Sequence, residues 1–244
     1  MSPQAPTVSV RNATFRHHEV TVFEALDLEL EGGKWTCLLG PCGIGKTSLL
    51  RLIAGLTNGD AAAEIRCSDG RPLAGRLAYM AQQDLLLPWC NAIDNVCVGP
   101  RLRGRVTNAD TGRATQLLAD LGLAGRERDL PRTLSGGMRQ RVALARTLFE
   151  DRPCVVMDEP FSALDAITRY HLQELAAERL GGRTVLLVTH DPFEALRLGH
   201  RIVVLAGQPA RISPPIEPAH TPPRRHGDPQ FMSLYAELWE RLAA

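Results

Sequence analysis

Hydrophobic positions in the first part of the chain follow the period of β-strands. Apolar and polar residues alternate over 8–15 and 20–30, and a third, short run at 35–39 is mostly apolar and follows the turn Glu31-Gly32-Gly33. Alternation with a period of two is typical of half-buried strands, and a short continuous apolar run bounded by turn residues is consistent with a fully buried one. The pattern predicts a short antiparallel β region followed by a buried strand.

The second half of the chain alternates between helical and strand patterns. The predicted helices cover 138–150, 166–179 and 192–198, and the predicted strands cover 154–157, 184–189 and 202–205. Repeated β-α-β units are typical of a parallel sheet with helices on its faces. The fold class expected is therefore α/β with a mostly parallel sheet.

Two segments depart from that alternation. Residues of about 84–135 carry helical periodicity interrupted by prolines and glycines, and we assign them to an inserted helical subdomain. The proline-rich stretch after Gly207 predicts an extended linker, and 231–242 predicts a short amphipathic helix. We expect a main domain at 1–210 and a C-terminal extension at 211–244.

Charge and composition exclude several classes of function. The 244 residues hold 28 Lys+Arg and 27 Asp+Glu, a net charge of +1, so no global positive field favours a nucleic-acid partner. The longest apolar runs fall far short of the roughly 18 to 20 residues that span a bilayer, and no secretory signal is recognisable at the N-terminus. The six cysteines and seven histidines lack zinc-ligand or disulfide-framework spacing. These features predict a protein that stays in the cytosol.

Residues 40–47 read GPCGIGKT and match the phosphate-binding pattern GxxxxGK[ST] between the predicted strand 35–39 and a predicted helix at 46–54. In such a loop, glycines let backbone N–H groups converge on phosphate, the lysine reaches the β- and γ-phosphates, and the hydroxyl binds Mg²⁺. A plain loop is the alternative, and the strand and helix on either side argue against it. The residues predicted to bind nucleotide here are Gly40, Pro41, Cys42, Gly43, Ile44, Gly45, Lys46, Thr47 and Ser48.

Two carboxylates, Asp158 and Glu159, follow the apolar run 154–157. Ligands bind at the carboxyl ends of parallel strands, so Asp158 there can hold the Mg²⁺ shell and Glu159 can orient or deprotonate the attacking water. Alone, the pattern is equally typical of a solvated turn. Beside the phosphate loop it indicates a phosphate-cleaving enzyme.

A third motif, Leu-Ser-Gly-Gly-Met at 134–138, precedes the predicted helix 138–150. Ser135, Gly136 and Gly137 present a hydroxyl and free N–H groups at the positive end of that helix, a second anion site. At this point the sequence resembles the ATP-binding cassette (ABC) ATPases, whose signature is Leu-Ser-Gly-Gly-Gln. The resemblance covers about residues 7–210 and implies a P-loop NTPase fold that uses ATP and Mg²⁺.

The resemblance assigns further roles. Gln82, which ends a predicted strand beginning at residue 77, matches the Q-loop glutamine that touches Mg²⁺ and senses a transmembrane partner, with Gln83 as the alternative. His190 matches the switch histidine that contacts the γ-phosphate and supports Glu159. Residues 162–165 resemble the D-loop, which signals across a dimer. The implied metal ligands are Thr47, Gln82 and Asp158.

Adenine stacking is assigned to His17. Related proteins carry an aromatic residue, most often Tyr, near the N-terminus, and the pattern of 12–17 places that position on His17. Because imidazole stacks less well than a phenol ring, Phe15 or Val22 is expected to help.

The resemblance implies the energising subunit of a membrane transporter. Two copies would bind two ATP molecules head to tail, each nucleotide held between the 40–47 loop of one copy and Ser135 to Gly137 of the other. Closure of this homodimer would drive integral membrane permease subunits, and a periplasmic or extracellular solute-binding protein would take part indirectly. The chain would then lie peripherally on the cytoplasmic face of the cell membrane.

Residues 82–89 and the tail 228–231 resemble the nitrate/sulfonate/taurine and hydroxymethylpyrimidine importer group. An ordinary apolar turn is the alternative interpretation of 85–89. Two other functions compete: a soluble ABC ATPase in assembly, DNA repair or ribosome function, and a small-molecule P-loop kinase, against which the 134–138 motif argues. The solute cannot be read from this chain, because its pocket lies on other chains.

Overall fold

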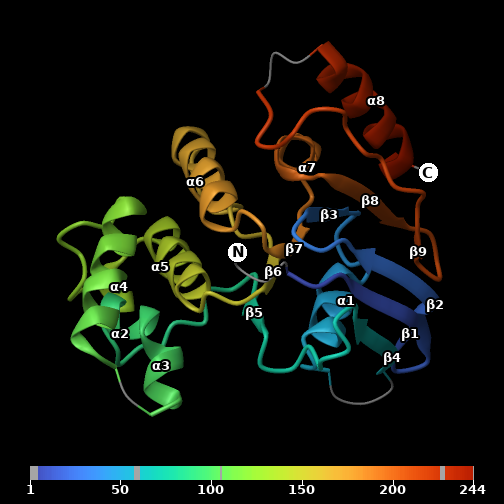
Figure 1. Cartoon of the computed structure of the whole chain (residues 1–244). Helices are drawn as coiled ribbons and strands as arrows, with labels where there is room; N and C mark the ends of the chain where they lie inside the picture. The colour runs from blue at the N-terminus through green and yellow to red at the C-terminus, as the bar shows by residue number, and fades with distance from the viewer. Residues whose placement is uncertain (1–4, 58–60, 105, 226–228, 244) are drawn as a thin grey trace. The chain divides into compact units, whose positions relative to one another are not determined.

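Two compact units interleave along the chain in the computed structural model, which describes residues 5–57, 61–104, 106–225 and 229–243 (Figure 1). Unit 1 contains the described residues up to Leu77, Arg152–Glu159 and those from Leu180 onward. Unit 2 contains Ala78–Asp151 and Pro160–Arg179. Unit 2 extends beyond the predicted insertion at 84–135, because two later helices also belong to it.

Unit 1 begins with the antiparallel β region that the alternation predicts. Strand β1 (Val8–His17) pairs with β2 (Val20–Leu30) and with β4 (Ala61–Cys67), in the order β2-β1-β4. The sequence analysis did not predict β4, whose first residues are three alanines, a residue type depleted in strands. Its pairing with β1, rather than its own pattern, makes it a strand.

The second sheet of unit 1 is parallel except at one edge, which confirms the predicted fold class. All five residues of each of its three adjacent strands β6, β7 and β3 are buried, so both faces of this sheet are covered. The strands in spatial order are β6 (Cys154–Asp158), β7 (Thr184–Val188), β3 (Trp35–Leu39), β8 (Arg201–Ala206) and the antiparallel β9 (Arg211–Ile212).

Three helices complete unit 1: α1 (Lys46–Ile53), α7 (Pro192–Leu198) and α8 (Pro229–Ala243). Part of the predicted linker after Gly207 forms β9, and Arg224 in the same stretch is only 6% exposed, so these parts of the stretch are packed within unit 1 and do not form a free linker. The first residue of the tail pattern at 228–231 lies outside the described residues.

Unit 2 is helical. Ser135 caps α5, because its Oγ accepts a hydrogen bond from the Met138 N–H at 3.2 Å. The helix therefore starts at Gly136, two residues before its predicted start. One strand, β5 (Leu77–Met80), crosses the boundary between the units. The helices are α2 (Ala92–Val96), α3 (Val98–Leu102), α4 (Asn108–Asp120), a short 3₁₀ turn (Pro131–Thr133), α5 (Gly136–Phe149) and α6 (Ala166–Arg179).

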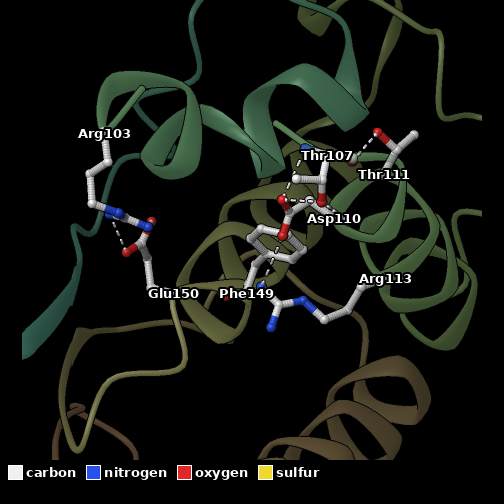
Figure 2. A network of polar contacts seen from close by, with 7 residues as sticks. All are labelled: Arg103, Thr107, Asp110, Thr111, Arg113, Phe149 and Glu150. Atoms are coloured by element: carbon white, nitrogen blue, oxygen red, sulfur yellow. Dashed lines mark hydrogen bonds and ion pairs between the residues drawn. The ribbon is translucent and has the colours of Figure 1, made fainter. Parts of the chain in front are cut away.

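Side chains of α4 and of the loop before it hold the end of α5 (Figure 2). The guanidinium of Arg113 lies 4.0 Å from the centre of the Phe149 ring and donates to the Phe149 carbonyl at 3.2 Å. Arg103 makes a two-pronged ion pair with Glu150, at 2.9 and 3.3 Å. These contacts join segments that are well separated in sequence into one helical body.

Within the part of the chain that the structure describes, no helix is long and apolar enough to cross a membrane.

Candidate nucleotide-binding site

The loop between β3 and α1 requires glycine at two positions for different reasons. Gly43 and Gly45 have φ of +80° and +107°, values that L side chains rarely adopt. A Cβ on Gly45 would also lie 2.5 Å from Cγ1 of Val22 in β2. This loop therefore turns tightly against the antiparallel sheet before α1 begins at Lys46, and its backbone N–H groups adjoin the positive end of the helix.

Lys46 is buried and its ammonium lies within the loop. Nζ donates to the carbonyl oxygens of Gly40 at 2.6 Å and Pro41 at 2.9 Å. Burial lowers the pKa of Lys46, and the nearby charges of Glu159 and Asp158 oppose that change. A positive charge fixed in a glycine loop at a helix N-terminus is suited to bind phosphate.

Thr47 and Asp158 form the oxygen-rich side of the site. Thr47 Oγ1 donates to Asp158 Oδ2 at 2.7 Å, and Asp158 is 1% exposed. Burial raises the pKa of Asp158, while the hydrogen bond from Thr47 lowers it. A hydroxyl and a carboxylate are hard oxygen ligands of the type that Mg²⁺ prefers, so these residues fit that ion.

Glu159 and His190 meet because β6 and β7 are neighbours in the sheet. Asp158 at the end of β6 pairs in register with Val188 at the end of β7. The next residues of both strands therefore leave the sheet at one edge, and His190 Nδ1 lies 3.0 Å from Glu159 Oε1. The Glu159 side chain is 12% exposed and that of His190 is 55% exposed, so the carboxylate is largely shielded from solvent while the imidazole is open to it.

The backbone of Glu159 is in the left-handed region, with φ of +48°. That conformation is uncommon for a residue with a side chain and costs about 1–3 kcal/mol, so surrounding contacts must hold it. One such contact is the hydrogen bond from the Glu159 N–H to the Val188 carbonyl at 2.9 Å. Strain of this kind is concentrated at functional sites.

A pocket of about 530 Å³ lies beside the loop. Its described lining combines residues 20–22 of β2, 41–44 of the loop and 207–209 of the turn between β8 and β9. Neither His17 nor Phe15 is among these lining residues, whereas Val22 is. The stacking role of His17 remains a prediction. Of His17, Phe15 and Val22, only Val22 is among the described lining residues of the pocket.

The turn at 207–209 is a part of the site that the sequence analysis missed. The Ala210 N–H donates to the Val22 carbonyl at 2.8 Å and so brings this turn beside β2. Nearly two hundred residues separate Val22 from Ala210, and no local motif in the sequence predicts their contact.

Ser48 lies in α1 of unit 1, and the remaining predicted residues belong to unit 2. β5 ends at Met80, so Gln82 lies in a bend beyond the strand and does not end it as predicted. Ser135 caps α5, and a Cβ on Gly137 would lie 3.2 Å from the carbonyl oxygen of Ala163. The signature motif and the 162–165 segment are therefore in close contact within this unit.

Comparisons with known proteins agree on one family. A family model described as "ABC transporter" matches residues 23–162. The chain is 45% identical over 233 residues to the aliphatic sulfonates import ATP-binding protein SsuB 1 of Rhodococcus jostii (strain RHA1), covering 93% of this chain and 89% of that protein. It is 40% identical over 239 residues to an uncharacterized ABC transporter ATP-binding protein of Haemophilus influenzae (strain ATCC 51907 / DSM 11121 / KW20 / Rd), covering 96% and 98%.

A solved structure has the same fold. The dimeric post-hydrolysis state of the ATP-binding cassette MJ0796 bound to ADP and Pi superposes with a TM-score of 0.76 at 26% identity. The match covers 87% of this chain and 99% of that one.

Proposed function

Since this chain belongs to the ABC transporter family of ATPases, we propose that it binds and hydrolyses ATP, with Mg²⁺, to drive import of a small solute through a separate membrane permease. The observation that carries the proposal is the cluster at the carboxyl edge of the parallel sheet. There the buried Lys46, the Thr47–Asp158 pair and the Glu159–His190 pair gather around one phosphate loop.

Residues of the phosphate loop and of α1 bind ATP. The converging N–H groups and the ammonium of Lys46 hold the β- and γ-phosphates, and Lys46 exchanges its carbonyl partners for phosphate oxygens. Thr47 and Asp158 would hold Mg²⁺, which when bound neutralises phosphate charge as the γ-phosphoryl group departs. The pocket beside the loop receives the base and ribose, between β2 and the 207–209 turn.

Glu159 and His190 carry out the hydrolytic step. The carboxylate of Glu159 orients a water molecule and takes one of its protons while the water oxygen forms a bond to the γ-phosphorus. The bond between that phosphorus and the β,γ-bridging oxygen breaks, and the electron pair stays on ADP. His190, at 3.0 Å from Glu159, holds the carboxylate in place and can donate to the γ-phosphate.

Glu159→Gln tests this assignment. The amide keeps the size of the side chain but cannot accept the proton, so we expect turnover to fall about 10²-fold or more with ATP affinity retained. An ATP-bound dimer should accumulate and can be measured by size-exclusion chromatography. Glu240→Gln, an exposed site on α8, is the matched control. Near-normal turnover of Glu159→Gln would remove Glu159 from the mechanism.

We propose further that two copies act as a head-to-tail dimer, in which Ser135 to Gly137 complete the nucleotide site of the opposite copy. The dimeric state of MJ0796 supports the formation of a dimer. Ser135→Arg should leave the ATP affinity of the monomer intact but block dimer formation and hydrolysis. Ser135→Thr, which keeps a capping hydroxyl for α5, is the control. Loss of ATP binding by monomeric Ser135→Arg would contradict the head-to-tail arrangement.

The permease is proposed to dock on unit 2 at the cytoplasmic face of the membrane. The side chains of Leu85 and Trp89, 58% and 75% exposed, give this unit an apolar surface suited to a protein partner. Within the nitrate, sulfonate, taurine or pyrimidine-precursor type of solute, the names of the aliphatic-sulfonate import relatives support a sulfonate. Co-purification with a permease, followed by transport assays with its solute-binding protein, tests both points. Activity in a cytosolic complex without a permease would favour the soluble alternative.

A further inference from the structure

The C-terminal part of the chain holds both ends of the helix that follows His190. That helix, α7, begins two residues after His190, and α8 packs against it (Figure 1). We use the term C-terminal segment for residues 216–225 and 229–243. Every contact described below lies within unit 1.

At the start of α7, the ring of Phe193 contacts two aromatic side chains of α8. It stacks on Phe231 with centroids 5.4 Å apart and planes 25° apart, and it meets Tyr235 at 4.3 Å. Asp191 caps the helix by accepting the Phe193 N–H at 2.9 Å. The residue that receives the aromatic contacts is thus joined by the cap to the neighbour of His190.

At the end of α7, Arg224 supplies hydrogen-bond donors to the free carbonyl groups. Its Nη1 donates to Leu196 O at 2.8 Å and to Gly199 O at 2.7 Å. The backbone is tied in both directions, because the Arg224 N–H donates to Arg197 O at 2.9 Å and Arg197 Nη1 donates to Arg224 O at 3.1 Å. The last carbonyls of a helix lack partners within the helix, and an arginine side chain can satisfy them.

α7 has only seven residues, and helices this short are not stable by themselves. Its position, and with it the direction in which the chain leaves β7 at His190, therefore depends on what packs against it. The C-terminal segment is itself anchored, because Phe231 and Leu238 are buried and Arg241 donates to Pro214 O. A fixed support thus contacts a short helix that directly follows a site residue.

We propose that the C-terminal segment is a positioning element for His190, acting through the contact of Tyr235 with Phe193 and the bonds of Arg224 to the end of α7. The inference rests on the proposed function, since it assumes that His190 acts in ATP hydrolysis. When the support is loosened, His190 moves away from Glu159 and the chemical step slows. ATP binding is spared, because neither Tyr235 nor Arg224 lines the pocket beside the phosphate loop and Lys46 bonds to carbonyl groups of the loop itself.

Tyr235→Ala tests the proposal in the full chain. Small misplacements of catalytic groups lower rates by up to about 10²-fold, so we expect kcat to fall by about 10- to 100-fold with the ATP dissociation constant within about twofold of its original value. Tyr235→Phe keeps the ring and should restore kcat. Met232→Ala, a 64% exposed site on the same helix, is the matched control and should have no effect.

The decisive measurement repeats Tyr235→Ala in the His190→Ala background under single-turnover conditions, where slow hydrolysis is measurable. If Tyr235 acts through His190, the second substitution should cause no further loss. An equal loss in both backgrounds, or a weaker ATP affinity in proportion to the loss of kcat, overturns the inference and leaves α8 a structural support only. If Tyr235→Ala does not fold, Tyr235→Leu keeps apolar volume without the ring and answers the same question.

Failure of the proposed function gives a different result. In that case the unmodified chain does not hydrolyse ATP, or His190→Ala hydrolyses it at the original rate. When His190→Ala is impaired and Tyr235→Ala is not, the proposed function stands and only the positioning role is overturned.

Discussion

Gly45→Ala combines two separable costs in the phosphate loop. The first is conformational, because φ of +107° is a region that alanine rarely adopts, at about 1–3 kcal/mol. The second is steric, because the new Cβ would lie 2.5 Å from Cγ1 of Val22, and overpacking of this kind costs about 1–3 kcal/mol. Together they predict a loss of roughly 2–6 kcal/mol in the free energy of unfolding, or a change of loop shape that relieves them.

The relief would be visible in nucleotide binding. Hydrogen bonds from the loop N–H groups to a charged phosphate are worth about 1.5–3 kcal/mol each, so losing one through a shifted backbone weakens ATP binding roughly 10- to 100-fold. We therefore expect Gly45→Ala to reduce both stability and ATP affinity. Urea unfolding measures the first, and titration calorimetry with ATP measures the second.

Val22→Ala separates the two costs. It removes the atom that the new methyl group meets but leaves the backbone of residue 45 unchanged. In the double variant the steric cost disappears and the conformational one stays, so we expect a coupling free energy of about 1–3 kcal/mol between the two substitutions. ATP affinity of the double variant is compared with that of Val22→Ala alone, because Val22 lines the pocket.

Strict additivity of the two substitutions in urea unfolding would show that β2 and the phosphate loop do not contact each other as described. Unchanged stability and unchanged ATP affinity of Gly45→Ala would refute the argument that the loop needs glycine at this position.

Three other predictions follow from single contacts. Burial lowers the pKa of His200 below its ordinary value of 6.5, and its Nδ1 accepts the Trp35 N–H at 3.1 Å, so the stability that His200 contributes is fully present above pH 6.5 and is lost as the pH falls below 6.5. His200→Asn can still accept that bond and should show a smaller fall in urea stability between pH 7.5 and 5.5. An equal fall in both proteins would contradict the assignment. Cys42 is exposed in the pocket lining, whereas Cys37, Cys67, Cys97 and Cys154 are buried, so a maleimide should block ATP hydrolysis unless ATP is bound, and inactivation that persists in Cys42→Ser would point to another thiol. Gln208 also lines the pocket, and a carboxamide can pair with the N6/N7 edge of adenine, so we expect 7-deaza-ATP to bind about 10-fold more weakly than ATP. Gln208→Ala should abolish this difference. If the variant still binds 7-deaza-ATP more weakly than ATP, another residue contacts N7.

Local pattern determined much of the secondary structure. The predicted bounds of 20–30, 35–39, 166–179 and 192–198 agree with β2, β3, α6 and α7. At α7 the reason is visible in the chain, since Asp191 caps the helix and Pro192 occupies its first turn. The pattern failed at β4, which is a strand through its pairing with the distant β1. It also placed the start of α5 two residues late, because the cap at Ser135 is a local hydrogen bond that the spacing of apolar residues does not show.

The chemical groups of the site could also be predicted from the sequence. A glycine loop with a lysine, and a strand that ends in two carboxylates, each indicate their chemistry within a few consecutive residues. The sequence did not show which other residues lie close to those groups in space. The order of strands in the sheet puts His190 at 3.0 Å from Glu159, the hydrogen bond between Ala210 and Val22 brings the 207–209 turn to the pocket, and Arg224 joins the C-terminal segment to α7. Much of the backbone conformation follows from interactions among near neighbours, so the local pattern predicts it. Contacts between distant residues depend on how whole elements pack, which only the tertiary structure decides.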